Sequence, residues 1–125
     1  MEPLAEGTKE LIELGATRFL EEVPALKQLK LVVRLDLRAR RDSQTWRVEL
    51  PAIEVARDPA ADAKVTVLAP RSHFNELARD GRLQHWRDAY QNGYVRVTGQ
   101  EELIKLVGRV IERHEAREKT KKRRL

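Results

Sequence analysis

The chain has 125 residues, of which 25 are Lys or Arg, 20 are Asp or Glu and none is Cys. This length suits one domain with a single hydrophobic core, and the high charged fraction of 36% indicates a soluble globular domain with a crowded charged surface. Without Cys there is no disulfide, no thiol nucleophile and no Cys-based zinc site. No apolar stretch is long enough for a transmembrane helix, and no fixed-period repeat predicts a solenoid.

The positive charge lies at one end of the chain. Residues 117–125 contain six bases and one acid, whereas the other 116 residues contain 19 bases and 19 acids. Because nucleic-acid binding depends on neutralising phosphates, the neutral body argues against nucleic acid as a partner. Two interpretations of this basic C-terminal tail remain open: a solvated helix end, or an accessory segment that contacts an anionic membrane surface or nucleic acid.

The first two predicted elements are a helix within residues 5–28 and a strand over residues 29–39. Apolar residues recur at three-four spacing in the first segment, and Pro24 ends or kinks that helix. Apolar and polar residues alternate in the second segment, so the strand has one apolar face, formed by Leu29, Leu31, Val33, Leu35 and Leu37. The opposite face is expected to contact water.

Hairpins and further strands follow. Residues 41–43 form the first hairpin loop, and residues 46–50 continue the alternation. Pro51 interrupts the pattern because proline cannot donate a ladder hydrogen bond. The segment through Val55 is therefore either two strands or one strand broken by a bulge. Residues 65–69 predict the next half-buried strand.

From residue 70 the apolar period becomes helical. It predicts two short helices, a brief strand over residues 94–98 and a long final helix. Thr98 and Glu101 have the spacing of a capping box, which predicts Thr98 as the N-cap of the final helix. Gly108 lies inside that helix at a cost of about 1 kcal/mol relative to Ala, and a close packing partner explains it better than a bound ligand. The segregated order of elements predicts an α+β fold, with an antiparallel or mixed sheet and helices over one face.

No catalytic or metal-binding constellation is visible in the sequence. His73, His85 and His114 are far apart, and none has a partner at metal-ligand spacing. Ser72 precedes His73 directly, and adjacent residues on a helix do not form a nucleophile–base pair. No Gly-rich phosphate loop occurs. The sequence therefore predicts a protein that is not an enzyme and that needs no cofactor.

An ordered series of short motifs runs through the second half of the chain. The series comprises Ala63-Lys64-Val65-Thr66-Val67, Phe74-Asn75-Glu76-Leu77-Ala78, Gly81-Arg82-Leu83, Ala89-Tyr90-Gln91-Asn92-Gly93 and Val95-Arg96-Val97-Thr98-Gly99. Upstream, residues 46–50 fit the second strand of the same pattern. With this series the chain resembles the sterol carrier protein type 2 family over most of residues 29–112.

The resemblance implies a five-stranded sheet with helices packed on one face and a hydrophobic tunnel between them. It implies a lipid-binding domain over residues 1–116, followed by the basic tail, that carries fatty acid, acyl-coenzyme A, phospholipid or sterol-like lipid without catalysis. Eight residues either fill a core or line this tunnel, and the lipid-carrier hypothesis takes them as ligand-binding: Phe74, Leu77, Trp86, Tyr90, Val95, Val97, Leu103 and Val107. Trp86 is bulkier than the residue usual in the family and would narrow the tunnel.

The transfer of an acyl chain from water into the protein supplies enough free energy for lipid binding. Burying a chain of about 16 carbons contributes about 12 kcal/mol, and association costs of about 4–15 kcal/mol reduce this to micromolar binding with little headgroup discrimination. The alternative hypothesis is a structural or interaction module of the same fold with a filled core, which partners a separate enzyme. The sequence leaves monomer and homodimer open. It predicts a cytoplasmic protein, because its start is unlike a signal peptide and its end is unlike a Ser-Lys-Leu signal.

Overall fold

A computed structural model describes residues 7–124 of the chain, and their side chains as far as residue 121. Five strands are present: β1 (Leu31–Arg38), β2 (Gln44–Leu50), β3 (Glu54–Arg57), β4 (Val65–Pro70) and β5 (Arg96–Gly99). The helices are α1 (Thr8–Glu22), the short 3₁₀ helix η1 (Pro24–Gln28), α2 (Arg71–Asp80), α3 (Leu83–Gln91) and α4 (Glu101–Arg124).

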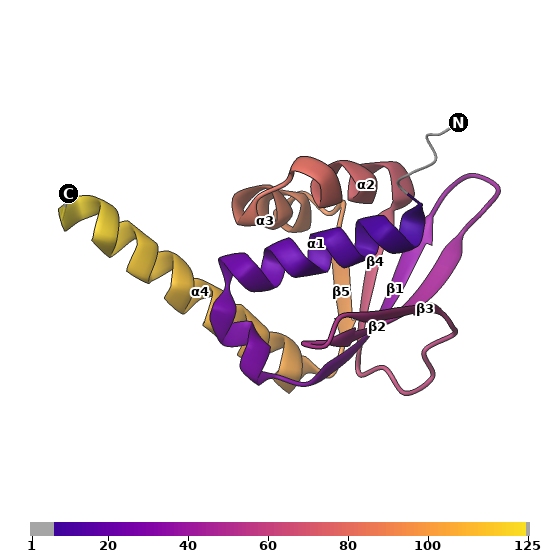
Figure 1. The fold of residues 1–125 in the computed structure, drawn as a ribbon, viewed down its shortest axis with the longest axis horizontal. Helices are drawn as coiled ribbons and strands as arrows, with labels where there is room; N and C mark the ends of the chain where they lie inside the picture. The colour runs from indigo at the N-terminus through magenta and orange to yellow at the C-terminus, as the bar shows by residue number, and fades with distance from the viewer. Residues whose placement is uncertain (1–6, 125) are drawn as a thin grey trace.

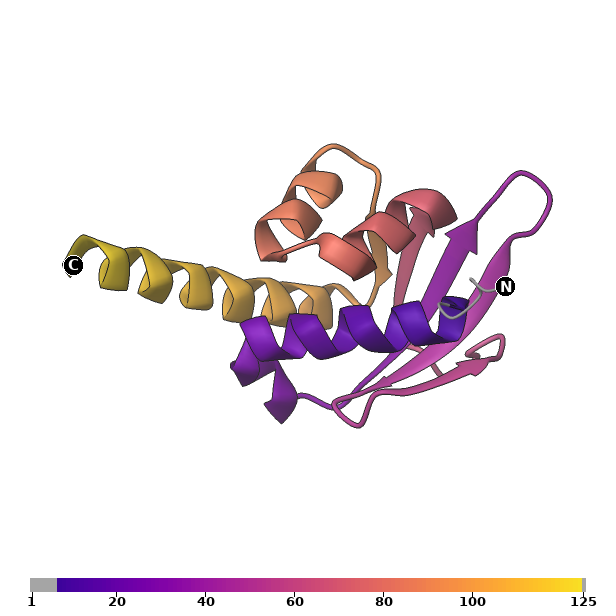
Figure 2. The same cartoon turned by 45° about the horizontal axis from the view of Figure 1, so that its top comes forward.

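The strands form one mixed sheet in the order β3-β2-β1-β4-β5. β1 pairs in parallel with β4, and the other neighbouring strands pair antiparallel. Helices α1 and α2 lie across one face of this sheet, while α3 and α4 follow at the β5 side (Figures 1 and 2). The predicted α+β class, the mixed sheet and the placing of helices over one face are confirmed.

The alternation of apolar and polar residues in β1 gives the strand the apolar inner face that the sequence predicts. Leu31, Leu35 and Leu37 are buried beneath the helices, and Val33 on the same face is half-buried. The parallel register sets Leu35 beside Val67, so the apolar face continues from β1 into β4. The strand begins at Leu31 and not at residue 29, because the chain first completes η1 after Pro24. Pro24 ends the preceding helix as expected, since α1 stops at Glu22.

The interruption at Pro51 separates two strands and is not a bulge. Residues 51–53 form a tight turn that contains a cis Leu50–Pro51 bond and Ile53 at a φ of 60°. After this turn β3 runs back along β2, with Val55 opposite Val48. The shift in alternation seen in the sequence is therefore the reversal of the chain, which returns Val55 to the buried face of the sheet.

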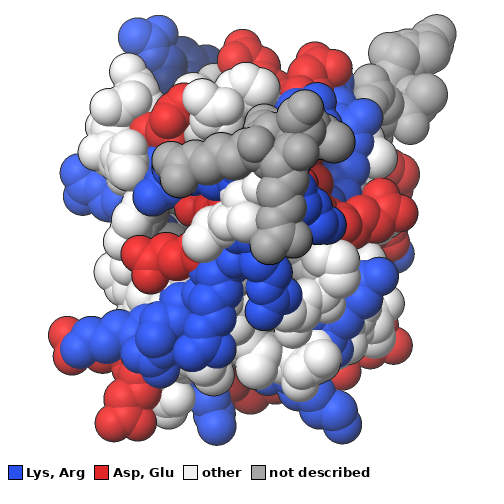
Figure 3. Space-filling view, turned by 90° about the vertical axis from the view of Figure 1, so that its left-hand side faces the viewer, with Lys and Arg blue, Asp and Glu red and all other residues white. Residues whose placement is uncertain are grey.

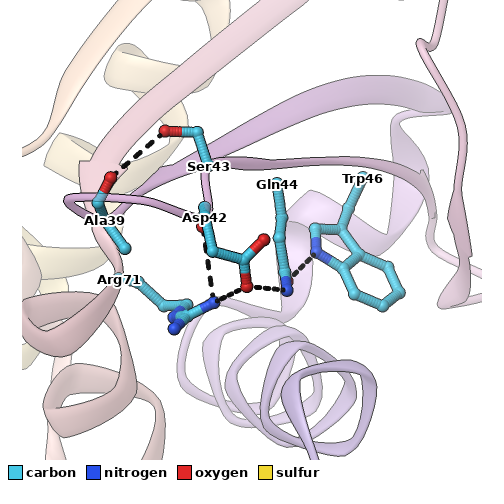
Figure 4. A network of polar contacts seen from close by, with 6 residues as sticks. All are labelled: Ala39, Asp42, Ser43, Gln44, Trp46 and Arg71. Carbon is cyan, nitrogen blue, oxygen red and sulfur yellow. Dashed lines mark hydrogen bonds and ion pairs between the residues drawn. The ribbon is translucent and has the colours of Figure 1, made fainter.

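A polar network ties the β1–β2 hairpin to the start of α2 (Figure 4). Arg71 Nη1 donates to Asp42 Oδ2 at 2.9 Å, and Gln44 Nε2 donates to the same oxygen at 3.2 Å. The indole N–H of the buried Trp46 donates to Gln44 Oε1 at 3.1 Å, so its polar atom is satisfied. The hydrogen bonds that Asp42 accepts, of which the one from Arg71 contributes most, lower the pKa of Asp42.

A second ion pair on the outer face of the sheet gives a pH-dependent test. Arg47 Nε and Nη2 donate to the two oxygens of Asp62 at 3.1 and 2.8 Å, which holds the pKa of Asp62 below its ordinary value. A lowered carboxyl pKa stabilises the fold above the unfolded pKa and ceases to do so as pH falls through the folded value. We therefore expect Asp62→Asn to lower the melting temperature slightly at pH 7. The difference from the original protein should be complete above about pH 5 and should shrink progressively in thermal melts below about pH 4, as pH falls toward the lowered pKa of Asp62. A difference that does not change with pH would contradict the ion-pair explanation.

The buried residues form two groups. The larger, which we call the sheet core, joins the inner face of the sheet to α1, α2 and α3, and includes Leu37, Trp46 and Phe74. The smaller, the helix core, consists of Leu20, Val23 and Leu26 at the end of α1 and in η1. Half-buried residues of α4 pack against the helix core, and no described residue of α4 is itself fully buried.

The start of helix α4 differs from the prediction. Thr98 is not its N-cap, because Thr98 belongs to β5, where it pairs with Thr66, and the helix begins at Glu101. The helix runs through residue 116 and continues to Arg124, so most of the basic tail forms the last turns of α4. Leu125 lies outside the described residues. In both views this end of α4 projects beyond the body of the molecule (Figures 1 and 2).

Candidate functional site

Half-buried apolar side chains gather where the sheet core meets the helix core. Leu50 and Ile53 pack against both groups, and the ring of Phe19 on α1 contacts the ring of Trp86 on α3 edge-on, with centroids 6.3 Å apart. The other half-buried apolar residues of this region come from the sheet, α3, α4 and the end of η1: Val33, Val67, Val97, Leu83, Val107, Val110, Ile111 and Leu29. We call this set, with Leu50, Ile53, Phe19 and Trp86, the junction surface.

The start of α3 is fixed by polar contacts that set the position of Trp86. Glu22 Oε2, at the end of α1, accepts a hydrogen bond from the backbone N–H of Leu83 at 2.7 Å. His85 Nδ1 accepts from the backbone N–H of Arg82 at 2.9 Å, at the residue that precedes the first turn of α3. Because these acceptors satisfy free N–H groups at this end of the helix, α3 starts beside the end of α1. This brings Trp86 against Phe19 and Phe74.

The eight predicted ligand-binding residues fall into three groups in the structure. Phe74, Leu77 and Val95 are fully buried in the sheet core. Trp86, Val97 and Val107 are half-buried members of the junction surface, and Leu103 is half-buried on α4 outside both cores. Tyr90 is 54% exposed, unlike the other seven. Their role in ligand binding stays a prediction.

Sequence reasoning did not select several residues of the junction surface. Val33 and Val67 were placed on the inner face of the sheet by their alternation, but nothing in that pattern shows that helices leave them partly uncovered. Phe19 and Leu83 also carry no local signal, because their exposure depends on how α1 and α3 approach each other.

Gly108 on α4 has open space beside it. A Cβ built on Gly108 meets no atom within 4 Å among the described residues. The expectation that a close packing partner explains this glycine is therefore wrong. Gly15 on α1, by contrast, is closely packed. A Cβ there would lie 3.3 Å from the Cβ of Ala78 and 3.8 Å from the Trp86 ring.

Two surface cavities lie on the helical side of the molecule. One, of about 450 Å³, is polar and lies between the end of α1 and the α2–α3 turn, lined by Arg18, Glu21, Glu22, Asp80, Gly81 and Arg82. The other, of about 490 Å³, lies between α2 and α3 beside the stacked rings of His73 and Tyr94. Of the eight predicted residues only Leu77 lines either cavity, and neither lies between the sheet and α4.

The second cavity is lined by two histidines and three carboxylates from residues 73–88: His73, His85, Glu76, Asp80 and Asp88. Within the described part of the chain, no three His, Asp or Glu side chains are grouped so as to hold a metal ion. No helix in residues 7–124 is both long and apolar enough to cross a lipid bilayer.

Solved structures reveal the fold to which this arrangement belongs. The crystal structure of Sterol Carrier Protein 2 Like 2 from Aedes aegypti matches 83% of this chain and 99% of its own, with 21% identity and a TM-score of 0.56. The chain has the sterol carrier protein 2 fold. The solution structure of the palmitated form of the Aedes aegypti protein matches equally well, with a TM-score of 0.56, 20% identity and coverage of 80% of this chain and 93% of that one.

Sterol Carrier Protein 2 from Yarrowia lipolytica, in its apo form, has the same fold. It matches 74% of this chain and 83% of its own, with 16% identity and a TM-score of 0.52. No family model matches this sequence, and no curated protein matches it either. The relation to the sterol carrier protein 2 structures is therefore carried by the arrangement of helices and strands, which confirms the resemblance inferred from the motif series.

Proposed function

We propose that the protein binds the acyl chain of a lipid on the junction surface, without catalysis. The observation that carries this proposal is the division of the core into two groups, with partly buried apolar side chains of the sheet, α1, α3 and α4 packed against them and Leu50 and Ile53 packed against both. Partly exposed apolar side chains contributed by several elements offer a surface that an apolar ligand can cover.

The chemistry of this surface favours an apolar ligand. Covering apolar surface contributes about 25 cal/mol per Å², and the side chains of the junction surface are aliphatic or aromatic. Three predicted residues, Trp86, Val97 and Val107, belong to the proposed site, and Val33 and Val67 extend it across the sheet. Leu103, about one turn before Val107 on the same side of the helix, continues it along α4.

The comparisons support this choice of ligand by analogy. One protein of the same fold is described as palmitated. A saturated chain of that kind has no polar group along its length, which suits a surface lined by Val, Leu, Ile and aromatic side chains. The expected dissociation constant is about micromolar, because association costs of about 4–15 kcal/mol offset most of the hydrophobic gain.

A displacement assay tests the proposal. The protein should take up a fluorescent fatty acid, and unlabelled palmitate should displace it. Leu103→Glu should weaken uptake by about tenfold or more, because it places a charge against the chain, while Leu103 belongs to neither core and its replacement should leave the fold intact. Lys105→Glu provides the matched control, since Lys105 is exposed on the same turn of α4.

Lack of uptake by the folded original protein would overturn the proposal and favour the interaction module with a filled core. Equal uptake by Leu103→Glu and Lys105→Glu would show that a bound chain does not lie against this part of α4. Circular dichroism of each variant establishes that the fold is retained.

A further inference from the structure

We propose that the basic end of α4, residues 117–124, docks the protein onto the surface of an anionic phospholipid membrane. This segment carries six bases and one acid, in a chain whose other residues are balanced in charge. A cluster of this size attracts anionic headgroups, with each Lys or Arg near the surface strengthening binding about fivefold.

The described cations of this segment are available to a partner. From Ala116 to Lys121 every residue is exposed. The nearest described link to the body is the ion pair of Glu115 with Arg87 on α3, at 2.5 Å, just before the helix projects. Lys121 lies 3.7 Å from Glu118, and among the described side chains Arg117 and Lys119 form no ion pair. Viewed from the side on which α4 ends, Lys and Arg form a broad area of the surface (Figure 3).

The period of the α-helix places two of these cations on the same side of α4 as apolar side chains. At 3.6 residues per turn, Arg117 lies about two turns beyond Val110 on the same side of the helix, and Lys121 lies about four turns beyond Val107. Val107 and Val110 are half-buried members of the junction surface. One side of α4 therefore changes along its length from apolar to cationic.

That combination distinguishes a membrane from a nucleic acid. Val107 and Val110 pack against the helix core and hold α4 to the body, so the cationic turns that follow them are presented together to an array of anionic headgroups. Nucleic acid offers phosphates but no apolar chains, and its recognition calls for a basic face that the neutral remainder of this chain does not supply. The inference goes beyond acyl-chain binding and does not depend on it.

Vesicle co-sedimentation with the full chain tests the inference. We expect binding to vesicles of phosphatidylcholine with phosphatidylserine and much weaker binding to phosphatidylcholine alone, and we expect added salt to reduce binding. Arg117→Glu with Lys121→Glu should reduce affinity at least about 20-fold. Arg117→Gln with Lys121→Gln, which removes the two charges without reversing them, should cause a smaller loss.

The matched control changes net charge by the same amount at the other end of the molecule. Arg38 and Arg40 are exposed near the tip of the β1–β2 hairpin, far from the end of α4 in both ribbon views. Arg38→Glu with Arg40→Glu should retain most of the binding. Equal losses in the two charge-reversal pairs would overturn the inference, because net charge alone would then explain binding.

Two further results would also overturn it. One is equal binding to vesicles with and without phosphatidylserine. The other is salt-sensitive binding to duplex DNA, lost in Arg117→Glu with Lys121→Glu, by a protein that does not bind the vesicles. Palmitate displacement on the same variants should be unchanged, so a failure of acyl-chain binding is seen separately from a failure of membrane docking.

Discussion

Trp86→Ala should lower the free energy of unfolding by about 3 kcal/mol, as expected for removing a large aromatic side chain from a packed site. The indole joins three helices: its centroid lies 5.7 Å from Phe74 on α2 and 6.3 Å from Phe19 on α1, with both rings edge-on. Such aromatic pairs contribute beyond the area that they bury. Urea denaturation followed by circular dichroism measures the change.

Tyr90→Ala is the matched control on the same helix. Tyr90 is 54% exposed, so its removal should change the free energy of unfolding by no more than about 0.5 kcal/mol. Similar losses for the two variants would contradict the placing of α3, because they would require Tyr90 to be packed as Trp86 is.

Gly15→Val should destabilise the protein by about 1–3 kcal/mol or more, because α1 and α2 leave no room for a branched side chain at this position. The position of a Cβ on Gly15 is already 3.3 Å from the Cβ of Ala78, and two further methyl groups would overlap α2 or Trp86. Chemical denaturation would show a lower midpoint with an unchanged slope.

Gly108→Ala should have the opposite sign. Gly108 is also a helix glycine, but open space surrounds the position of its Cβ, so Ala should stabilise α4 by about 0.5–1 kcal/mol. A loss of stability on this change would show that the space beside Gly108 is occupied by protein atoms. The structure therefore predicts opposite changes in the free energy of unfolding for the substitutions at Gly15 and Gly108.

Local patterns predicted most of the secondary structure. Alternation located the inner faces of β1 and β4, and Pro24 marked the end of α1. Pairing could not be predicted in the same way, because β1 lies beside β4, a strand that follows two others in the chain. Thr98 had the spacing of a cap but is held in β5 by its pairing with Thr66, so tertiary structure outweighed the local signal.

The candidate site was predictable only in part. Helical spacing grouped Trp86, Ala89 and Tyr90, but a helix of nine residues packs by a narrow face, and this face contains Ala89 and not Tyr90. Sequence also gave no means of assigning Phe74 to one core and Val107 to the other. Whether a side chain is partly exposed depends on how whole helices and strands approach each other, so no local sequence pattern marked the junction surface.

The lengths of the outer strands bear on how copies of this protein meet. β3 and β5 form the two edges of the sheet, and each has only four residues. Short edges present few unpaired backbone groups to another chain, which is one way in which natural proteins prevent strand-to-strand aggregation. Any self-association at high concentration is therefore expected to proceed through side chains of the helical layer and not by continuation of the β ladder.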